Sequence, residues 1–348
     1  MGPFIKDKND GTKMMIHSLI ALIPITIFSF IKRGNTGLHT IILILISSIS
    51  IFLFEAIINI IKEKNIKNIF KDNYGLLNGL ILALILPSNT PILLVIIGTL
   101  VATIITKILY LIFKKNIINS VVISYLIIFI LIKFISPEII VNNNLLNNNI
   151  LNDIGTYETL VKPYGRILKI FIGNIPEIIG SMSAALSILA LAYLMITKVI
   201  KWRIPTIYII TIFAITYVIG GINDLGIWYP LFQIFTGGLI FKSIFIASEQ
   251  QTSPVTPIGQ ILYAIFLGIL TIIFRYLTPI PEGILISILI MNMLVPILDR
   301  IGALARFDFK KTIIPFIIAW ILIIGLSIGI SVKYDNNENT IQNIENKK

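Results

Sequence analysis

The chain has 348 residues, of which 56% are hydrophobic and 13% are charged, and its mean hydropathy is +0.93. Because a soluble domain carries about 25% charged residues, these totals exclude a soluble globular protein and predict an all-α polytopic membrane protein. The absence of cysteine excludes disulfides, thiolate metal sites and cysteine nucleophiles. The net charge of +11 comes largely from lysines in short loops between apolar runs, which is typical of membrane topology signals and not of nucleic-acid binding.

Apolar runs of about 18 residues or more predict transmembrane helices. Two runs in this chain, 75–87 and 230–248, are short or interrupted. The others, in chain order, are 14–31, 38–61, 91–113, 119–136, 177–198, 205–222, 258–276, 283–298 and 313–332. The sequence therefore predicts about 10–11 transmembrane segments.

The two short runs share a pattern of glycine and proline breaks. Residues 74–79 lead into the first run, which stops at the proline-flanked segment 87–91. The second run is interrupted by the glycine pair in 235–239 and stops before the polar segment 249–257. Such segments at matching positions of two halves indicate a functional centre near the midplane. Lipid cannot supply hydrogen-bond partners for free amides, so we expect the segments 87–91 and 249–257 to face each other or a path through the protein. The alternative is that both are ordinary surface loops between tilted helices.

The order of spans predicts four regions. Residues 1–136 form a first five-helix repeat, 137–176 an extracytoplasmic loop, 177–300 a second five-helix repeat, and 301–348 an extra span with a polar tail. An odd number of crossings in each repeat makes the two halves inverted, as in urea-channel-like scaffolds. The basic residues that follow alternate spans share one face if the N-terminus is cytoplasmic.

Four charged residues within the predicted spans are candidates for charges inside the membrane, where a charge at the helix centre costs about 2.5–3.5 kcal/mol. Glu55, Lys107 and Lys242 are candidates for an ion path, and we expect Glu55 and Lys107 to pair across the bundle. Arg275 lies near the outer end of its span, so we expect its side chain to snorkel to the interface. The alternative for each is a structural pair or an interface anchor.

The outer loop carries a pattern of the form Asp-x-x-Thr-x-x-Thr in Asp153, Thr156 and Thr159, followed by Gly-Asn-Ile-Pro at 173–176. This pattern resembles the covalent flavin site of the D-type subunits of the Rnf-type ion-translocating ferredoxin:NAD oxidoreductases. It also resembles the site in the B-type subunits of the sodium-pumping NADH:quinone reductases. The resemblance covers nearly the whole chain, because further motifs match in order and spacing at 71–80, 202–205, 252–260 and 281–300.

The resemblance implies that FMN is joined through its phosphate to the hydroxyl of Thr159 by a separate magnesium-dependent flavin transferase, with Asp153 and Thr156 as recognition residues. It implies a membrane component of a multi-subunit complex in the bacterial cytoplasmic (inner) membrane, which passes electrons coupled to Na⁺ or H⁺ export and is not catalytic alone. B-type relatives also hold riboflavin non-covalently, and the sequence gives no place for it here. Since no nucleotide-binding signature or cysteine cluster occurs, electrons must come from other subunits.

Several residues depart from the family pattern. Glu158 stands where the family has a small residue, and a carboxylate beside a phosphoester costs about 1 kcal/mol through water. Ser248 to Gln251 replace an expected Thr-Asp-Pro-Val, and the span 313–332 lies beyond the family's usual end. Two alternatives therefore stay open: a non-redox channel or transporter on the same scaffold, and a structural protein that anchors its neighbours.

Overall fold

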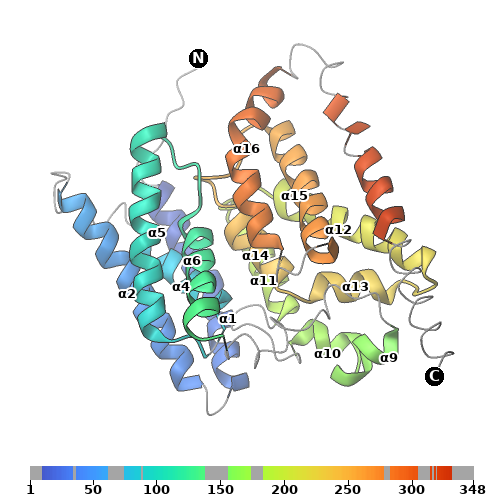
Figure 1. Cartoon of the computed structure of the whole chain (residues 1–348), viewed down its shortest axis with the longest axis horizontal. Helices are drawn as coiled ribbons and strands as arrows, with labels where there is room; N and C mark the ends of the chain where they lie inside the picture. Colours follow the sequence, from blue (N-terminus) through green and yellow to red (C-terminus); the bar gives the residue numbers. More distant parts are fainter. Residues whose placement is uncertain are drawn as a thin grey trace.

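A computed structural model of the chain describes residues 10–33, 37–61, 74–87, 89–137, 156–173, 183–277, 283–304, 314–315, 317–318 and 320–330. Every regular element in these ranges is a helix, and the helices are arranged as a bundle (Figure 1). The predicted all-α class is therefore confirmed.

The first half of the bundle follows the predicted spans closely. Its helices are α1 (Asp10–Arg33), α2 (Gly37–Ile61), α4 (Gly75–Ile85), α5 (Ile92–Phe113) and α6 (Ser120–Ile135). α2 packs against α4 and α5, and α5 packs against α6. With 11 residues, α4 is about 16 Å long, roughly half of a bilayer's hydrocarbon thickness. The short first run is thus a half-length helix.

The second half contains a span that is broken in its middle. Its helices are α11 (Ala184–Ile196), α12 (Arg203–Ile222), α13 (Trp228–Phe235), α14 (Leu239–Lys242), the π-helical turn η4 (Ser243–Ala247), α15 (Pro257–Leu277) and α16 (Ile284–Leu304). The axis bends by 56° between α13 and the α14–η4 segment. Gly237 and Gly238 form the bend with φ of 69° and 63°, a conformation that glycine adopts without steric penalty.

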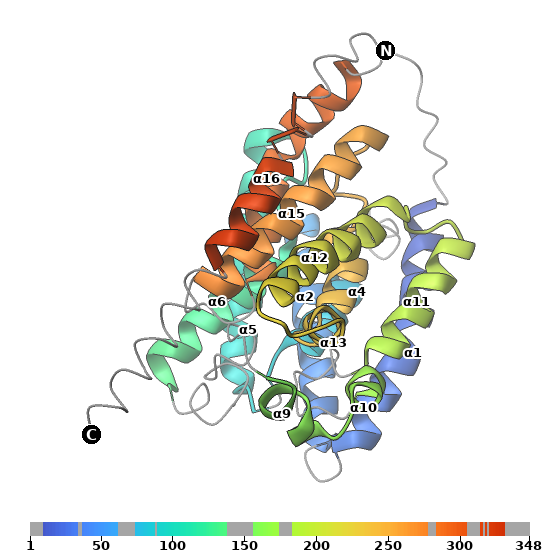
Figure 2. The ribbon, with the colours of Figure 1, turned by 90° about the vertical axis from the view of Figure 1, so that its right-hand side faces the viewer.

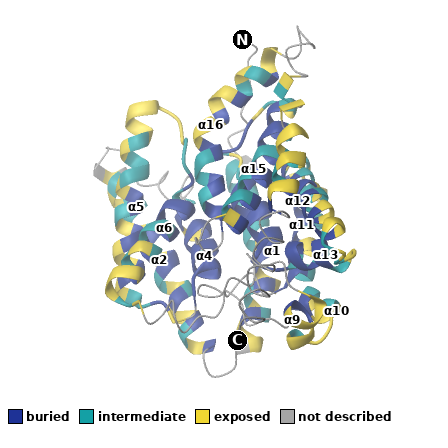
Figure 3. Ribbon diagram, turned by 45° about the vertical axis from the view of Figure 1, so that its right-hand side comes forward, coloured by how far each residue is buried: buried dark blue, intermediate teal, exposed yellow. Residues whose placement is uncertain are grey.

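The described helices confirm a multi-pass membrane protein. Six are long and apolar enough to cross a bilayer, or seven if the bent pair counts as one span, and α4, α6, α11 and Trp320–Ile330 are shorter apolar helices. Large apolar side chains such as Phe134 and Ile196, each 80% exposed, cover the outside of the bundle. Figure 3 shows α4 largely buried, whereas α2 and α5 carry exposed outer faces. The inverted relation between the halves stays a prediction.

A glycine lets α4 lie directly on α2. A Cβ at Gly79 would come within 2.4 Å of the Ser48 Cα and 2.5 Å of the Ser47 carbonyl oxygen. The Ser47 hydroxyl donates a hydrogen bond of 2.8 Å to the Gly79 carbonyl in this contact. The motif 74–79 therefore has a packing role at this position.

The described part of the outer loop forms a helical segment at one end of the bundle. It consists of α9 (Tyr157–Leu160), the 3₁₀ turn η3 (Lys162–Tyr164) and α10 (Ile167–Ile172), and α10 packs against α11 and α13. Figure 2 shows this segment at the end where α1 stops and α2 starts, opposite the C-terminal end of α16. We call residues 156–173 the outer segment.

Candidate functional site

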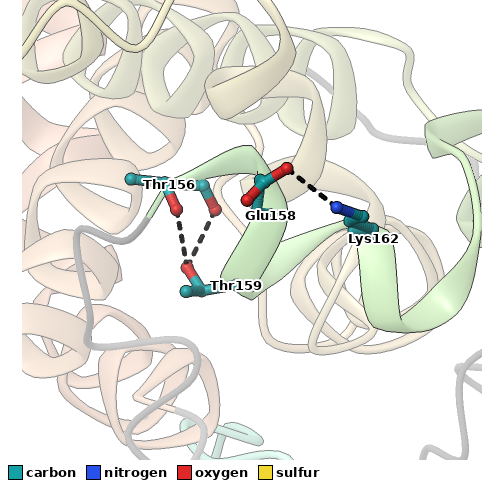
Figure 4. Close-up of polar contacts among 4 residues, drawn as sticks. All are labelled: Thr156, Glu158, Thr159 and Lys162. Carbon is teal, nitrogen blue, oxygen red and sulfur yellow. Dashed lines mark hydrogen bonds and ion pairs between the residues drawn. The ribbon is translucent and has the colours of Figure 1, made fainter.

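The hydroxyl of Thr159 lies on the exposed side of the outer segment. Thr156 has an extended backbone and begins α9, where its carbonyl accepts the backbone N–H groups of Thr159 (3.1 Å) and Leu160 (3.0 Å). The Thr159 Oγ1 also donates to this carbonyl at 2.9 Å and lies 3.4 Å from the Thr156 hydroxyl (Figure 4). Both threonines are exposed. The structure therefore brings two of the three predicted site residues together, and Asp153 lies outside the described residues.

Glu158 is paired within the same segment. Its carboxylate accepts a hydrogen bond of 2.8 Å from the Lys162 ammonium one helical turn later, and the two side chains are 74% and 66% exposed. Figure 4 shows Glu158 directed toward Lys162, whereas Thr159 is directed toward Thr156. The charge that departs from the family pattern thus has a counter-charge supplied by the chain itself.

The inner side of the outer segment is held against the broken span. Leu160, Val161 and Ile170 are almost completely buried. Two aromatic contacts add to this packing: the rings of Tyr157 and Trp228 meet edge-on at 5.3 Å, and those of Phe171 and Phe235 lie 5.0 Å apart. Phe235 is the last residue of α13. The position of Thr159 is therefore tied to the helix that ends at the break.

A second polar cluster joins the two halves of the bundle. Glu249, in the connection between η4 and α15, accepts hydrogen bonds from Asn119 (2.7 Å) and Thr252 (3.1 Å). Asn119 also caps α6, because its Oδ1 accepts the backbone N–H of Val121 at 2.8 Å. The polar segment 249–257, which follows the second short run, is thus tied to the connection between α5 and α6.

A parallel contact strengthens this junction. The amide of Asn116 donates to the Gln251 side-chain oxygen at 2.7 Å, three residues before Asn119 and two after Glu249. In the sequence, residues 248–251 stand out only as a departure from the family pattern. An acidic residue directly after a broken apolar segment is the signal that could have singled out Glu249.

The charges of Glu55 and Lys107 belong to the same junction. Glu55 in α2 interacts electrostatically with Lys107 in α5 and with Glu249, and it bonds to the backbone N–H of Gly75 at the start of α4. Burial raises the pKa of Glu249, which lies outside the spanning helices, to about 7, and the negative charge of Glu55 also acts to raise it. The hydrogen bonds from Thr252 and Asn119 oppose these effects. The junction therefore places a carboxyl group with a pKa near neutrality between the two halves of the bundle.

The other two predicted charges lie at the glycine bend at 236–238. Lys242 is completely buried, and its ammonium donates to the Gly237 carbonyl at 3.0 Å. Arg275 is only 3% exposed, and its Nη1 donates to the backbone carbonyl of Gln233 at 2.9 Å and to its side-chain oxygen at 2.8 Å. The expectation that Arg275 snorkels is wrong, because the end of α13 offers carbonyl acceptors inside the bundle.

Comparison with known proteins places this architecture in a family. A profile described as the NQR2, RnfD, RnfE family matches residues 1–308. The D-type component of a proton-translocating ferredoxin:NAD(+) oxidoreductase complex from Clostridium ljungdahlii is 27% identical over 320 residues, which cover 89% of this chain and 95% of that protein. The corresponding D-type component of a Na(+)-translocating complex from Acetobacterium woodii is 29% identical over 301 residues, with 86% and 91% coverage.

A more distant similarity extends to the quinone reductases. The B-type component of the Na(+)-translocating NADH-quinone reductase from Chlamydia pneumoniae is 31% identical over 143 residues, which cover 37% of this chain and 28% of that protein. The profile match covers both halves of the bundle and the outer segment between them. This chain therefore belongs to the NQR2, RnfD, RnfE family.

Proposed function

We propose that this chain is the membrane component of an ion-translocating ferredoxin:NAD oxidoreductase complex, that it carries FMN as a phosphoester on Thr159, and that it passes electrons coupled to Na⁺ or H⁺ export. Two relatives that match over most of the chain are D-type components of such complexes. The observation that carries the flavin assignment is the exposed Thr159 hydroxyl, held beside Thr156 on a segment packed against the broken span.

The residues around Thr159 suit attachment of a flavin phosphate. In that step the Thr159 Oγ bonds to the phosphorus of a flavin dinucleotide, the bond to the nucleotide breaks, and the hydroxyl proton is released as a nucleoside monophosphate leaves. Arg166 and Lys169 are exposed on the same segment and can pair with phosphate oxygens. The Thr156 carbonyl accepts the Thr159 hydroxyl proton in a hydrogen bond and so orients the Oγ lone pairs. Once bound, FMN supplies one- and two-electron redox chemistry.

The junction residues supply groups for the ion step. Glu249, Glu55 and Lys107 come from both halves of the bundle, and a carboxyl group with a pKa of about 7 exchanges a proton near neutral pH. Moving one charge against 100 mV requires about 2.3 kcal/mol, which equals the free energy of one electron falling through 100 mV. The junction therefore offers a carboxyl group for the ion step at the place where the two halves of the bundle meet.

The proposal also covers location and partners. The chain would lie in the bacterial cytoplasmic (inner) membrane with a cytoplasmic N-terminus, so that the outer segment faces the opposite side. Its partners would be the other subunits of the complex and a flavin transferase that loads Thr159. The described residues offer no assignment for the riboflavin that B-type relatives hold.

Flavin fluorescence on a denaturing gel tests the attachment. The chain is co-expressed with a magnesium-dependent flavin transferase, and we expect a fluorescent band from the wild type and none from Thr159→Val. Thr159→Ser keeps a hydroxyl and is the matched control, for which we expect a band. Mass spectrometry of the peptide around Thr159 should show one added FMN. Absence of a band from the wild type overturns the flavin assignment and favours the non-redox channel or transporter.

A further inference from the structure

The break at 236–238 leaves backbone carbonyls without helical partners inside the membrane. α13 ends at Phe235, Thr236 is extended with φ −102° and ψ 160°, and the two following glycines have positive φ. The last turn of any α-helix has carbonyls with no intrahelical N–H. Because lipid cannot satisfy them, the protein must supply the donors.

Two buried side-chain cations supply these donors. Arg275, from α15, donates to the carbonyl of Gln233 in the last turn of α13, at 2.9 Å. Lys242, from α14, donates to the carbonyl of Gly237 in the break itself, at 3.0 Å. Both side chains are buried, and both lie at the negative end of the α13 dipole. The carbonyls at the break therefore bind two buried positive charges.

The segment at 86–91 that ends the first short run is built differently. The residues described between Ile85 and Ile92 include no charged side chain, and there the Thr90 hydroxyl donates to the Pro87 carbonyl at 2.7 Å. The described donor side chain at that segment is therefore a neutral hydroxyl, whereas at the break at 236–238 the donors to the carbonyls are a buried ammonium and a buried guanidinium.

In transporters with broken spans, unwound carbonyls and the C-terminal ends of half-helices coordinate a cation. The Lys242 ammonium stands at such a place, and it has the unit charge and the need for oxygen acceptors of a dehydrated monovalent ion. We propose that the break at 236–238 is a monovalent-cation site whose occupant is the tethered ammonium of Lys242. The wild-type break then does not exchange ions with solution, and the ion that the complex moves uses other groups.

Removal of the tethered cation tests this. Thermal unfolding of the full chain in detergent is followed in NaCl, methylammonium chloride and choline chloride at equal ionic strength. We expect Lys242→Ala to be less stable than wild type in choline and to regain about 3 °C or more, with saturation, in sodium or methylammonium. Wild type should respond equally to all three salts. Phe241→Ala, which empties a buried volume on the same helix without removing charge, should be destabilised equally in all three.

Each outcome decides the proposal. Equal destabilisation of Lys242→Ala in every salt means that the lysine only closes a helix end, and it overturns the cation site. If the alanine variant does not accumulate, Lys242→Gln is measured, because it keeps an N–H donor for the Gly237 carbonyl and removes the charge. A glutamine variant as stable as wild type in choline also overturns the proposal, whereas a clear loss supports it. No flavin is needed in these measurements, so their failure leaves the assignment of Thr159 untouched.

Discussion

Neutralisation of Glu158 by Lys162 should decide how readily Thr159 accepts a flavin phosphate. Replacing Lys162 by glutamine keeps a long polar side chain and leaves the carboxylate next to Thr159 without its counter-charge. Attachment brings a negatively charged phosphate to the neighbouring hydroxyl. We therefore expect Lys162→Gln to slow flavin attachment.

The size of the effect follows from the exposure of the pair. Two unit charges 4 Å apart in water interact by about 1 kcal/mol, which is roughly a fivefold change in rate. The Glu158 and Lys162 side chains are 74% and 66% exposed, so solvent screens them and the change lies at about two- to fivefold. Because the Debye length falls from about 10 Å at 0.1 M salt to about 3 Å at 1 M, the difference should shrink as salt is added.

The assay is the initial rate of fluorescent-band formation at a fixed transferase concentration, compared among wild type, Lys162→Gln, Glu158→Gln and the double variant. Glu158→Gln should be at least as fast as wild type, and the double variant should match Glu158→Gln because no carboxylate remains to be neutralised. A double variant as slow as Lys162→Gln would refute the reasoning, since Lys162 would then act directly on the phosphate or the transferase. Equal rates for all four would show that the ion pair has no influence.

Two further predictions concern the scaffold. The folded-state pKa of Glu249 is raised from 4.5 to about 7, so the folded state binds its proton more tightly than the unfolded state does. The protonated carboxyl therefore contributes fully to the free energy of unfolding below about pH 4.5, and this contribution is lost as pH rises to about 7. Glu249→Gln should remove that loss and gain about 3 kcal/mol over wild type at pH 8, measured by chemical unfolding in detergent at pH 5 and pH 8; equal pH profiles would contradict this. Gly79→Ala should cost about 1–3 kcal/mol, because the new Cβ meets backbone atoms of Ser47 and Ser48, and its thermal midpoint should fall below that of Gly221→Ala, where nothing lies within 4 Å. Equal midpoints would show that α2 and α4 separate without penalty.

The spans could be predicted because their signal is local. A window of about 18 apolar residues is long enough to cross a bilayer whatever its neighbours are, and the predicted runs 38–61 and 258–276 agree with α2 and α15 within a residue. The glycine pair in 235–239 indicated a break for an equally local reason, since Gly237 and Gly238 both have positive φ. Neither signal gives the bend of 56°, which depends on how α13 packs.

The partners of the buried charges could not be predicted, because they are distant in the sequence. Glu249 and Asn119 are 130 residues apart, and Arg275 and Gln233 are 42 apart. The acceptor for Arg275 is also a backbone carbonyl, which exists as a free acceptor only because α13 stops there. The position of Arg275 near the end of its span predicted snorkelling, whereas in the structure its guanidinium donates to a carbonyl at the end of the neighbouring helix α13.

The contact between Phe171 and Phe235 connects the exposed and the buried parts of this chain. Phe235 is the last residue of α13, and the two glycines that form the bend follow directly after Thr236. The two glycines give the backbone a point about which it can turn, whereas α15 and α16 are continuous helices of 21 residues each. A change of charge on the outer segment should therefore move α13 about residues 236–238 before it moves any other helix. Arg275 and Lys242 hold the two carbonyls that such a movement would separate, so their hydrogen bonds set how far α13 can turn.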